Sequence, residues 1–212
     1  MLIDYYYLKN AWNIHPKGVI HVGAHVGQEL HVYSRDTDIK KIIFFEVSPS
    51  IYSELKVNLD NFMKSKPMHL ETILSYNFGL GSSEEDKELY LASNGESSSL
   101  LKPLLHLEKH SWVSFPRKEQ VEIKTLDSFK IQDCDFMNID VQGYELEVLK
   151  GARETLSHIN WIYLEVNSDY LYENCALVSE IDDFLLAFNF KREETKWVDH
   201  CNWGDAFYRK IL

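Results

Sequence analysis

The chain is poor in cysteine and has no long apolar run. Its three cysteines, Cys134, Cys175 and Cys201, lie far apart and form no CxxC pair. That spacing favours reduced thiols packed as small apolar side chains, and it excludes a disulfide framework or a zinc knuckle. Apolar runs such as Val19–Val22 and Phe184–Phe188 are far shorter than the roughly 20 residues that cross a bilayer. We therefore expect no membrane span.

Basic residues are also scarce. The 212 residues include 22 Lys and Arg against 33 Asp and Glu, which gives a net charge of −11. A nucleic-acid backbone would be repelled over most of such a surface, so nucleic acid is not expected as a partner. The first residues, MLIDYYYLKNAW, lack the basic region, apolar stretch and cleavage site of a secretory signal. A cytoplasmic location is expected.

The chain also lacks internal repeats and proline-rich linkers, and its length suits one hydrophobic core. We expect a single domain over residues 1–212, in which residues 1–16 form an N-terminal helical extension. Apolar runs that are typical of strands alternate with helical patterns. The expected strands are Val19–Gly23, Lys41–Glu46, Leu70–Tyr76, Lys87–Ala92, Phe136–Asp140 and Trp161–Val166. The expected helices are Gln28–Ser34, Ser50–Phe62 after a Ser-Pro-Ser capping signal, Tyr144–Leu149 ended by Gly151, and Val178–Phe188.

This alternation predicts an α/β fold with a three-layer, doubly wound, mostly parallel sheet. A strand can re-enter a sheet in the same direction only after a covering element has returned the chain. Two final extended runs, Phe190–Val198 and Asp205–Ile211, flank the turn-like Asn202-Trp203-Gly204 and predict a C-terminal antiparallel hairpin. Ligands of such sheets bind beyond the carboxyl ends of the strands, so the residues that follow each strand are candidates for a site.

The first expected strand is followed by two glycines. The sequence VIHVGAHVGQE places Gly23 and Gly27 in the turn before the first helix. Without Cβ atoms, glycines let a backbone approach a ligand closely and adopt unusual dihedral angles. The spacing is not the GxGxxG of a dinucleotide-binding turn, which disfavours a nicotinamide-dependent oxidoreductase. The turn predicts a cofactor cradle, although a turn needed only for packing would look the same.

An acidic residue ends the second expected strand. Glu46 follows the apolar run Ile42–Phe45 and lies about 20 residues beyond Gly27, the offset at which a carboxylate can accept hydrogen bonds from a ribose diol. At a partly buried sheet edge such a carboxylate needs hydrogen bonds to offset its desolvation. The alternative is an acidic residue in a surface loop.

The most specific stretch is DFMNIDVQGYELEVLKGA at Asp135–Ala152, where Asp140 ends a strand and Gly143-Tyr144-Glu145 starts a helix. In this stretch the chain resembles the FkbM family of methyltransferases, and the resemblance extends from about Val19 to Lys210. Other similar pieces follow in the family's order: VGAHVG at Val22–Gly27, Glu46 with Pro49, NFGLG at Asn77–Gly81, SSSL at Ser97–Leu100, TLDSF at Thr125–Phe129 and YLEVN at Tyr163–Asn167.

The resemblance implies a class I, Rossmann-like methyltransferase that uses S-adenosylmethionine to methylate a hydroxyl of a sugar, glycan or small metabolite. It implies catalytic roles for Asp140 and Glu165. With the turn and strand-end residues argued above, the residues expected at the cofactor are Gly23, Ala24, His25, Gly27, Glu46, Asn77, Phe78, Gly79, Ser99 and Asp140. His21 and His25 stand where the family usually has Asp and Asn. This departure leaves a second function open, a non-catalytic binding or scaffold protein, and neither function excludes a homo-oligomer.

Methyl transfer to an alcohol needs alignment and removal of a proton. Asp140 and Glu165 follow or end neighbouring strands and could act as the base. They could also bridge a Mg²⁺ ion, with Asn167 and water as further oxygen ligands. The structural alternatives are that Asp140 caps the following helix and that Glu165 pairs with a basic residue at the sheet edge.

Three other segments have simpler predicted roles. Ser97–Ser99 is expected to form a loop over the pocket. Asp127 is expected to cap the short turn after its strand. The stretch His106-Leu107-Glu108-Lys109-His110 lacks the HExxH spacing of zinc proteases and predicts a solvated helix face.

Overall fold

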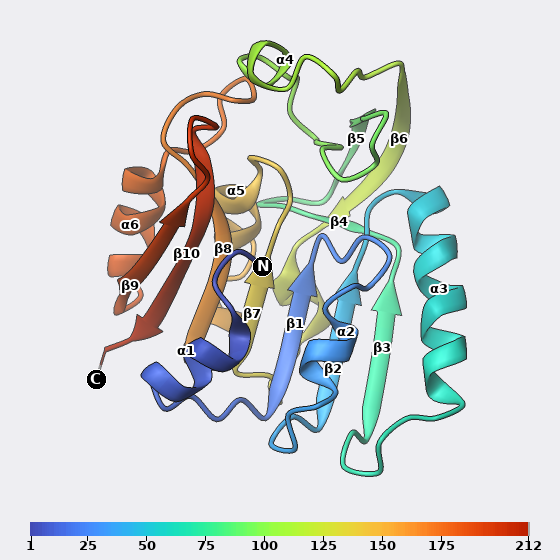
Figure 1. Cartoon of the computed structure of the whole chain (residues 1–212), viewed down its shortest axis with the longest axis vertical. Coiled ribbons are helices and arrows are strands. Elements are labelled where there is room, and N and C mark those ends of the chain that lie inside the picture. The colour runs from blue at the N-terminus through green and yellow to red at the C-terminus, as the bar shows by residue number, and fades with distance from the viewer. Residues whose placement is uncertain (212) are drawn as a thin grey trace.

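A seven-stranded sheet forms the centre of the molecule (Figure 1), and the computed structural model describes residues 1–211. Across the sheet the strands are β3 (Thr72–Tyr76), β2 (Lys41–Phe45), β1 (Gly18–Val22), β7 (Phe136–Ile139), β8 (Trp161–Asn167), β10 (Trp203–Lys210) and β9 (Phe190–Trp197). Neighbours from β3 to β8 pair in parallel, whereas β10 is antiparallel to β8 and β9. The predicted sheet and its C-terminal hairpin are confirmed.

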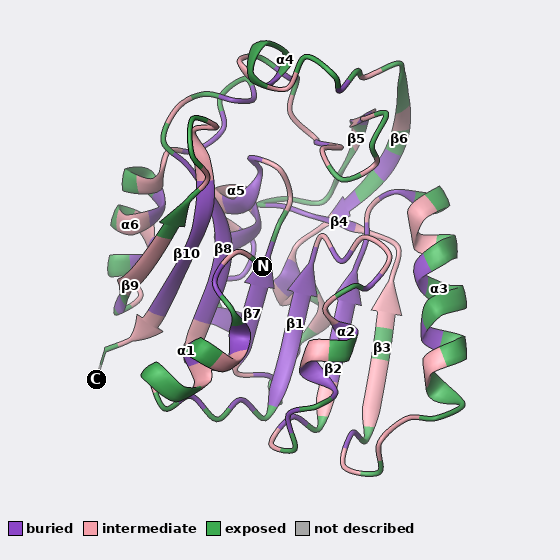
Figure 2. Cartoon of the chain, in the orientation of Figure 1, coloured by how far each residue is buried: buried purple, intermediate pink, exposed green. Residues whose placement is uncertain are grey.

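Helices cover both faces of this sheet, as the alternation of elements predicts. On one face lie α1 (Tyr5–Ala11), α2 (Leu30–Tyr33) and α3 (Pro49–Met63); on the other lie α5 (Glu145–Lys150) and α6 (Val178–Leu186). Successive β1 residues pack against the helices on opposite faces of the sheet. Val19 clusters with Leu55 of α3, whereas Ile20 clusters with Val148 of α5. Figure 2 shows the central strands as the buried layer between the helices.

The order of the strands places a crevice above β1. From β1 the sheet continues on one side to β2 and on the other to β7, so the chain connections leave in opposite directions at this point. The loops after these strands diverge there and leave room for a ligand. Gly23, Glu46 and Asp140 are the first residues after β1, β2 and β7 respectively.

A second, smaller sheet lies beyond the carboxyl ends of the central strands (Figure 1). Its order is β4 (Gly79–Leu80), β6 (Arg117–Lys124) and β5 (Glu85–Leu91). The sequence analysis identified β5 but missed β6, because RKEQVEIK is mostly charged. Only Val121 and Ile123 of β6 are buried, in a small cluster with Leu89 and Leu91. The short helix α4 (His106–Lys109) lies above this sheet.

Several predicted boundaries and local roles differ from the structure. The expected helix Gln28–Ser34 is only the single turn of α2, and β10 already begins at Trp203, within the expected turn. The helix α3 begins at Pro49, one residue before the expected Ser50, and the hydroxyl of Ser48 lies 3.1 Å from that of Ser50 and caps no backbone amide. In residues 1–211 there is no helix whose length and apolarity would let it cross a membrane.

Two further predictions concern single residue types. All three cysteines are free thiols, and Cys134 and Cys175 are buried as expected. Asp127 caps a turn, but this turn is not the one after its own strand that the sequence predicted. Its carboxylate accepts hydrogen bonds from the amides of Glu154 (2.9 Å) and Thr155 (2.8 Å), at the start of the 3-10 turn Thr155–Ser157, because the chain folds that distant turn against it.

Candidate active site

A cavity of about 520 Å³ lies at the carboxyl ends of β1, β2, β7 and β8. Gly23, His25, Glu46, Asp140 and Glu165 all line it. These side chains and turns were predicted from strand ends that are far apart in the sequence. The structure therefore brings the predicted cradle and the predicted catalytic carboxylates to one cavity.

The backbone at Gly23 has a geometry that requires glycine. Its φ is +79°, and a Cβ atom there would lie 1.7 Å from the carbonyl oxygen of Asp140. Its amide donates a hydrogen bond to the carbonyl oxygen of Phe45 at 2.9 Å. Gly27 also has positive φ, but a Cβ there would meet Leu55 at 2.8 Å. Gly23 thus shapes the cavity wall, whereas Gly27 permits the packing of α3.

Glu46 is tied to the turn that follows β1. Its Oε2 accepts a hydrogen bond from the His25 amide at 2.8 Å, and its Oε1 accepts one from the Ser48 amide at 2.8 Å. Burial raises the pKa of Glu46, and these two backbone hydrogen bonds act in the opposite direction. His25 has a φ of +48°, a left-handed conformation in which His is enriched among non-glycine residues. The carboxylate is therefore held in place at the cavity wall.

The two predicted catalytic carboxylates are linked through Gln142. Its side-chain nitrogen lies 2.9 Å from Asp140 Oδ1 and 2.9 Å from Glu165 Oε2, and it donates to both. Its Oε1 accepts a hydrogen bond from the Tyr172 hydroxyl at 2.9 Å. Gln142 itself has a φ of +55°, so its backbone is fixed in a left-handed turn. Sequence analysis missed this residue because its role depends on that turn.

Burial and mutual repulsion change the acidity of this group. Burial raises the pKa of Asp140 to about 6. Asp140 is exposed to the open cavity, so the full effect of burial acts when a ligand displaces water from it. Burial first, and then the charge of Asp140, raise the pKa of Glu165 well above its usual range. Of the two, Asp140 is therefore the stronger acid and ionises first.

Comparison with known proteins shows which family the chain belongs to. Residues 21–192 match the family model described as Methyltransferase FkbM domain. The chain belongs to this FkbM methyltransferase family. It is 32% identical over 117 residues to 2-O-methyltransferase NoeI of Sinorhizobium fredii, a match that covers 53% of this chain and 46% of that protein. The chain thus spans less than half of the curated relative that it matches.

Solved structures share the fold. The methyltransferase FkbM from Methylobacillus flagellatus KT aligns with a TM-score of 0.61 and 15% identity over 91% of this chain and 43% of that one. The magnesium protoporphyrin IX methyltransferase ChlM of Synechocystis PCC 6803, solved with bound SAM, aligns with a TM-score of 0.55 and 10% identity over 97% of this chain and 76% of that one. The Rossmann-like methyltransferase fold expected from the sequence is confirmed.

The Mg²⁺ hypothesis does not fit this FkbM-family site. The Gln142 amide nitrogen occupies the position between Asp140 and Glu165 that a bridging cation would need. Asn167, the predicted third ligand, does not line the cavity, and its amide atoms are buried without hydrogen-bond partners. Within residues 1–211 no group of three or more His, Cys, Asp or Glu side chains is arranged to hold a metal ion.

The structural alternatives for the two carboxylates are also wrong. It is Glu145, not Asp140, that accepts the backbone hydrogen bonds of the turn before α5, from Val141 at 3.1 Å and Gly143 at 3.0 Å. Glu165 forms no ion pair among the described residues, and its only side-chain hydrogen bond there is with Gln142. Both carboxylates are therefore available to a ligand in the cavity.

The remaining residues assigned to the cofactor fall into two groups. Phe78 and Gly79 line the cavity, as do Ser97 and Ser98 of the predicted loop. Ala24, Gly27, Asn77 and Ser99 do not line it. Asn77 donates to the backbone carbonyls of Glu46 and Val47, and the Ser99 hydroxyl donates to the Gln142 carbonyl at 2.7 Å. These two residues support the site from behind.

Sequence analysis missed one wall of the cavity. Tyr163, Asp205 and Trp203 line it from β8 and β10, and His106 and Trp112 line it from the α4 segment. The predicted solvated face at His106–His110 is wrong for His106, which is only 4% exposed because its ring packs 5.3 Å from Tyr172 and 5.5 Å from Phe115. The aromatic residues around His106 and Trp112 are the feature of the sequence that could have predicted this part of the wall.

Proposed function

We propose that this FkbM-family chain is an S-adenosylmethionine-dependent O-methyltransferase that acts on a hydroxyl of a sugar, glycan or small metabolite. The observation that carries the proposal is the bond between Glu46 and the His25 amide, which joins an acidic strand end to the glycine turn inside the cavity. Its support includes the relative NoeI, which is a 2-O-methyltransferase, and ChlM, whose structure contains SAM.

The residues present fit the methyl donor. Each oxygen of Glu46 accepts one backbone hydrogen bond and keeps a lone pair for a ribose hydroxyl. The missing Cβ of Gly23 lets the turn after β1 lie against the backbone of Asp140, so that both strand ends line one cavity. When bound, the donor supplies a methyl carbon that is electrophilic because it is attached to a sulfonium. Phe78 and Gly79 complete this part of the wall.

The acceptor hydroxyl is assigned to the carboxylate pair. Asp140 is ionised at neutral pH and takes the proton of the hydroxyl, since its pKa of about 6 is close to the working pH of a general base. Glu165 lines the cavity beside Asp140 and holds the acceptor by a hydrogen bond. Gln142 keeps both carboxyl groups in place. No step is assigned to a metal ion, because Gln142 fills the bridging position.

The test has two stages. Calorimetry with S-adenosylmethionine should show saturable binding with one site per chain. A labelled methyl donor and a panel of hydroxylated sugars, glycans and metabolites should then give a methylated product, and Asp140→Asn should not. Absence of donor binding would refute the proposal. Binding without turnover on every acceptor would instead favour the non-catalytic relative, which the substitution of His21 into the cavity wall motivates.

We also propose that residues 1–212 form one domain, that the protein is cytoplasmic, and that its acceptor is a small molecule rather than nucleic acid. The support is the acidic net charge of −11, which opposes binding to a phosphate backbone.

A further inference from the structure

The cavity has an unusual balance of charge. Its wall carries the carboxyl groups of Glu29, Glu46, Glu96, Asp140, Glu165 and Asp205. Of the described residues that line it, none is Lys or Arg. The positive group at the wall is the N-terminal ammonium of Met1, 3.7 Å from Glu29. A phosphate, sulfate or carboxylate on an acceptor would therefore meet repulsion, and the one ammonium at the wall is already paired with Glu29.

The methyl donor does not account for the whole acidic wall. Glu46 and Asp140 lie beside Gly23, at the ends of β2 and β7, where the donor is proposed to bind. Glu165 and Asp205 lie farther across the sheet, as register partners on β8 and β10. Asp205 accepts hydrogen bonds from the Tyr163 hydroxyl and the Leu2 amide. Its charge raises the pKa of Glu165, after burial and nearer carboxylates.

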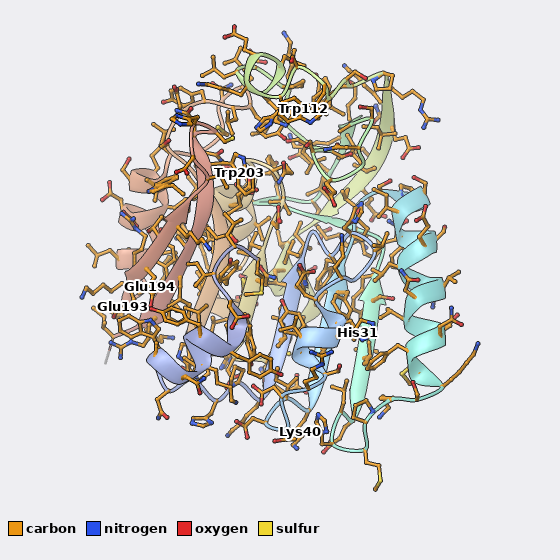
Figure 3. The ribbon with its side chains drawn as sticks, viewed as in Figure 1. His31, Lys40, Trp112, Glu193, Glu194 and Trp203 are labelled. Carbon is orange, nitrogen blue, oxygen red and sulfur yellow. The ribbon has the colours of Figure 1, made fainter. Side chains whose placement is uncertain are left out.

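Aromatic rings line the same cavity as these acidic residues. The ring of Tyr172 lies 5.3 Å from that of His106, His106 lies 4.7 Å from His110, and His110 lies 5.1 Å from Trp112. Trp203 lines the cavity at the start of β10. Figure 3 labels Trp112 below α4 and Trp203 at the upper end of β10. Trp112 is 75% exposed although it lines the cavity, so its ring has free surface for a ligand.

The histidines of this aromatic wall are uncharged at neutral pH. Burial lowers the pKa of His106 to about 4 and also lowers the pKa of His110. Neutral rings do not repel a cation. The Nδ1 atoms of His106 and His21 are buried without a hydrogen-bond partner among the described residues. Both side chains are more than nine-tenths buried and belong to residues of the cavity wall, where buried polar atoms without a partner are uncommon.

We propose that the acceptor carries a protonated amine, which lies between the aromatic side chains of Trp112 and Trp203 and the carboxyl groups of Glu165 and Asp205. This inference rests on the proposed function, because it assigns the acceptor of the same cavity. Aromatic faces attract ammonium groups, and carboxylates next to them add a direct electrostatic attraction. The acceptor class is an amino alcohol or amino sugar, and phosphorylated sugars are excluded.

The experiment compares three matched probes on the protein saturated with S-adenosylhomocysteine. Calorimetry first measures binding of S-adenosylhomocysteine. Glucosamine, glucose and glucose 6-phosphate are then titrated at low ionic strength and about pH 6.5, below the pKa of an α-amino type of group, with saturation-transfer NMR as the readout. Glucosamine should bind about tenfold more tightly than glucose, equivalent to one cation–π contact of about 1.4 kcal/mol. Glucose 6-phosphate should show no saturable binding.

Variants locate the contact. Trp112→Ala should remove most of the preference for glucosamine over glucose, and it should leave the fold intact because Trp112 is largely exposed. Trp197→Ala is the matched control, since Trp197 is also exposed but does not line the cavity. Equal affinity for the three probes, tighter binding of glucose 6-phosphate, or no binding of any probe to the loaded protein would overturn the inference. A failure of S-adenosylhomocysteine itself to bind would count against the proposed function instead.

Discussion

Gln142 holds Glu165 through a hydrogen bond of 2.9 Å, and the same amide nitrogen lies 2.9 Å from Asp140. One neutral side chain thus connects the two carboxyl groups of the cavity. In both cases the hydrogen bond favours the ionised form of the carboxylate, so it lowers a pKa that burial raises. The protonation of Asp140 and Glu165 therefore depends on Gln142 as well as on the two carboxyl groups themselves.

Gln142→Ala should therefore change the pH dependence of methylation. Loss of the amide donor raises the pKa of Asp140, so the acidic limb of the kcat profile should move to higher pH and kcat at neutral pH should fall. A purely structural role would lower stability without moving that limb. Gln142→Asn tests geometry, because it keeps an amide on a shorter chain. An unchanged pH profile in Gln142→Ala would contradict the assignment.

The wild-type protein should lose activity in acid. Asp140 acts only when ionised, and its folded-state pKa of about 6 is above the usual value of an aspartate. Activity should be full above that pKa and should fall as the pH decreases through about 6. Asp140→Asn should reduce kcat by about 10²- to 10⁴-fold, the usual contribution of a general base. Initial rates between about pH 5 and 8 would check both expectations, and a flat profile would reject Asp140 as the base.

Glu46→Ala should weaken donor binding. The carboxylate is proposed to accept hydrogen bonds from the donor's ribose, and hydrogen bonds to charged groups contribute about 1.5–3 kcal/mol each. The dissociation constant measured by calorimetry should rise by about tenfold or more. Glu54→Ala on the exposed face of α3 is a suitable control. If both variants bound the donor equally well, the role of Glu46 would be refuted.

Gly23→Ala should destabilise the protein strongly. The substitution combines an unfavourable φ of +79° with a Cβ that would lie 1.7 Å from a backbone oxygen, and backbone strain of this kind costs about 1–3 kcal/mol before the clash is added. Gly95→Ala is matched in φ, at +76°, but its Cβ would meet only side-chain atoms, of His25 at 3.2 Å and of Ile51 at 3.9 Å. Thermal unfolding should show a much larger loss of Tm for Gly23→Ala, and similar losses would contradict this account of the turn.

Chelators should leave the rate unchanged. Gln142 already occupies the position between Asp140 and Glu165, so methyl transfer should proceed equally with EDTA or with added Mg²⁺. By contrast, Gln142→Glu would place a third carboxylate beside the pair and should create divalent-cation binding that calorimetry detects. A wild-type rate that depends on Mg²⁺ would show that Gln142 moves aside for a cation.

Much of the fold was accessible from the sequence because parallel strands buried on both faces appear as apolar runs. Ile42–Phe45 and Trp161–Val166 are examples, and the strands β2 and β8 lie there. The strand β6 could not be predicted from the sequence, because its segment is charged on its exposed face and is stabilised by pairing with β5 and β4. Asp127 shows the same limit, because the turn that it caps is 27 residues away.

The sequence by itself determined the alternation of elements, the glycine bend at Gly23 and the acidic ends of the strands at Glu46 and Asp140, because these depend on local chemistry and on periodicity. Only the tertiary structure decided that Gln142 lies between two carboxylates and that Trp203 and Asp205 face them. Those placements depend on a left-handed backbone at Gln142 and on the antiparallel return of β10 along β8. Contacts between distant segments arise from strand order and register, which no local pattern specifies.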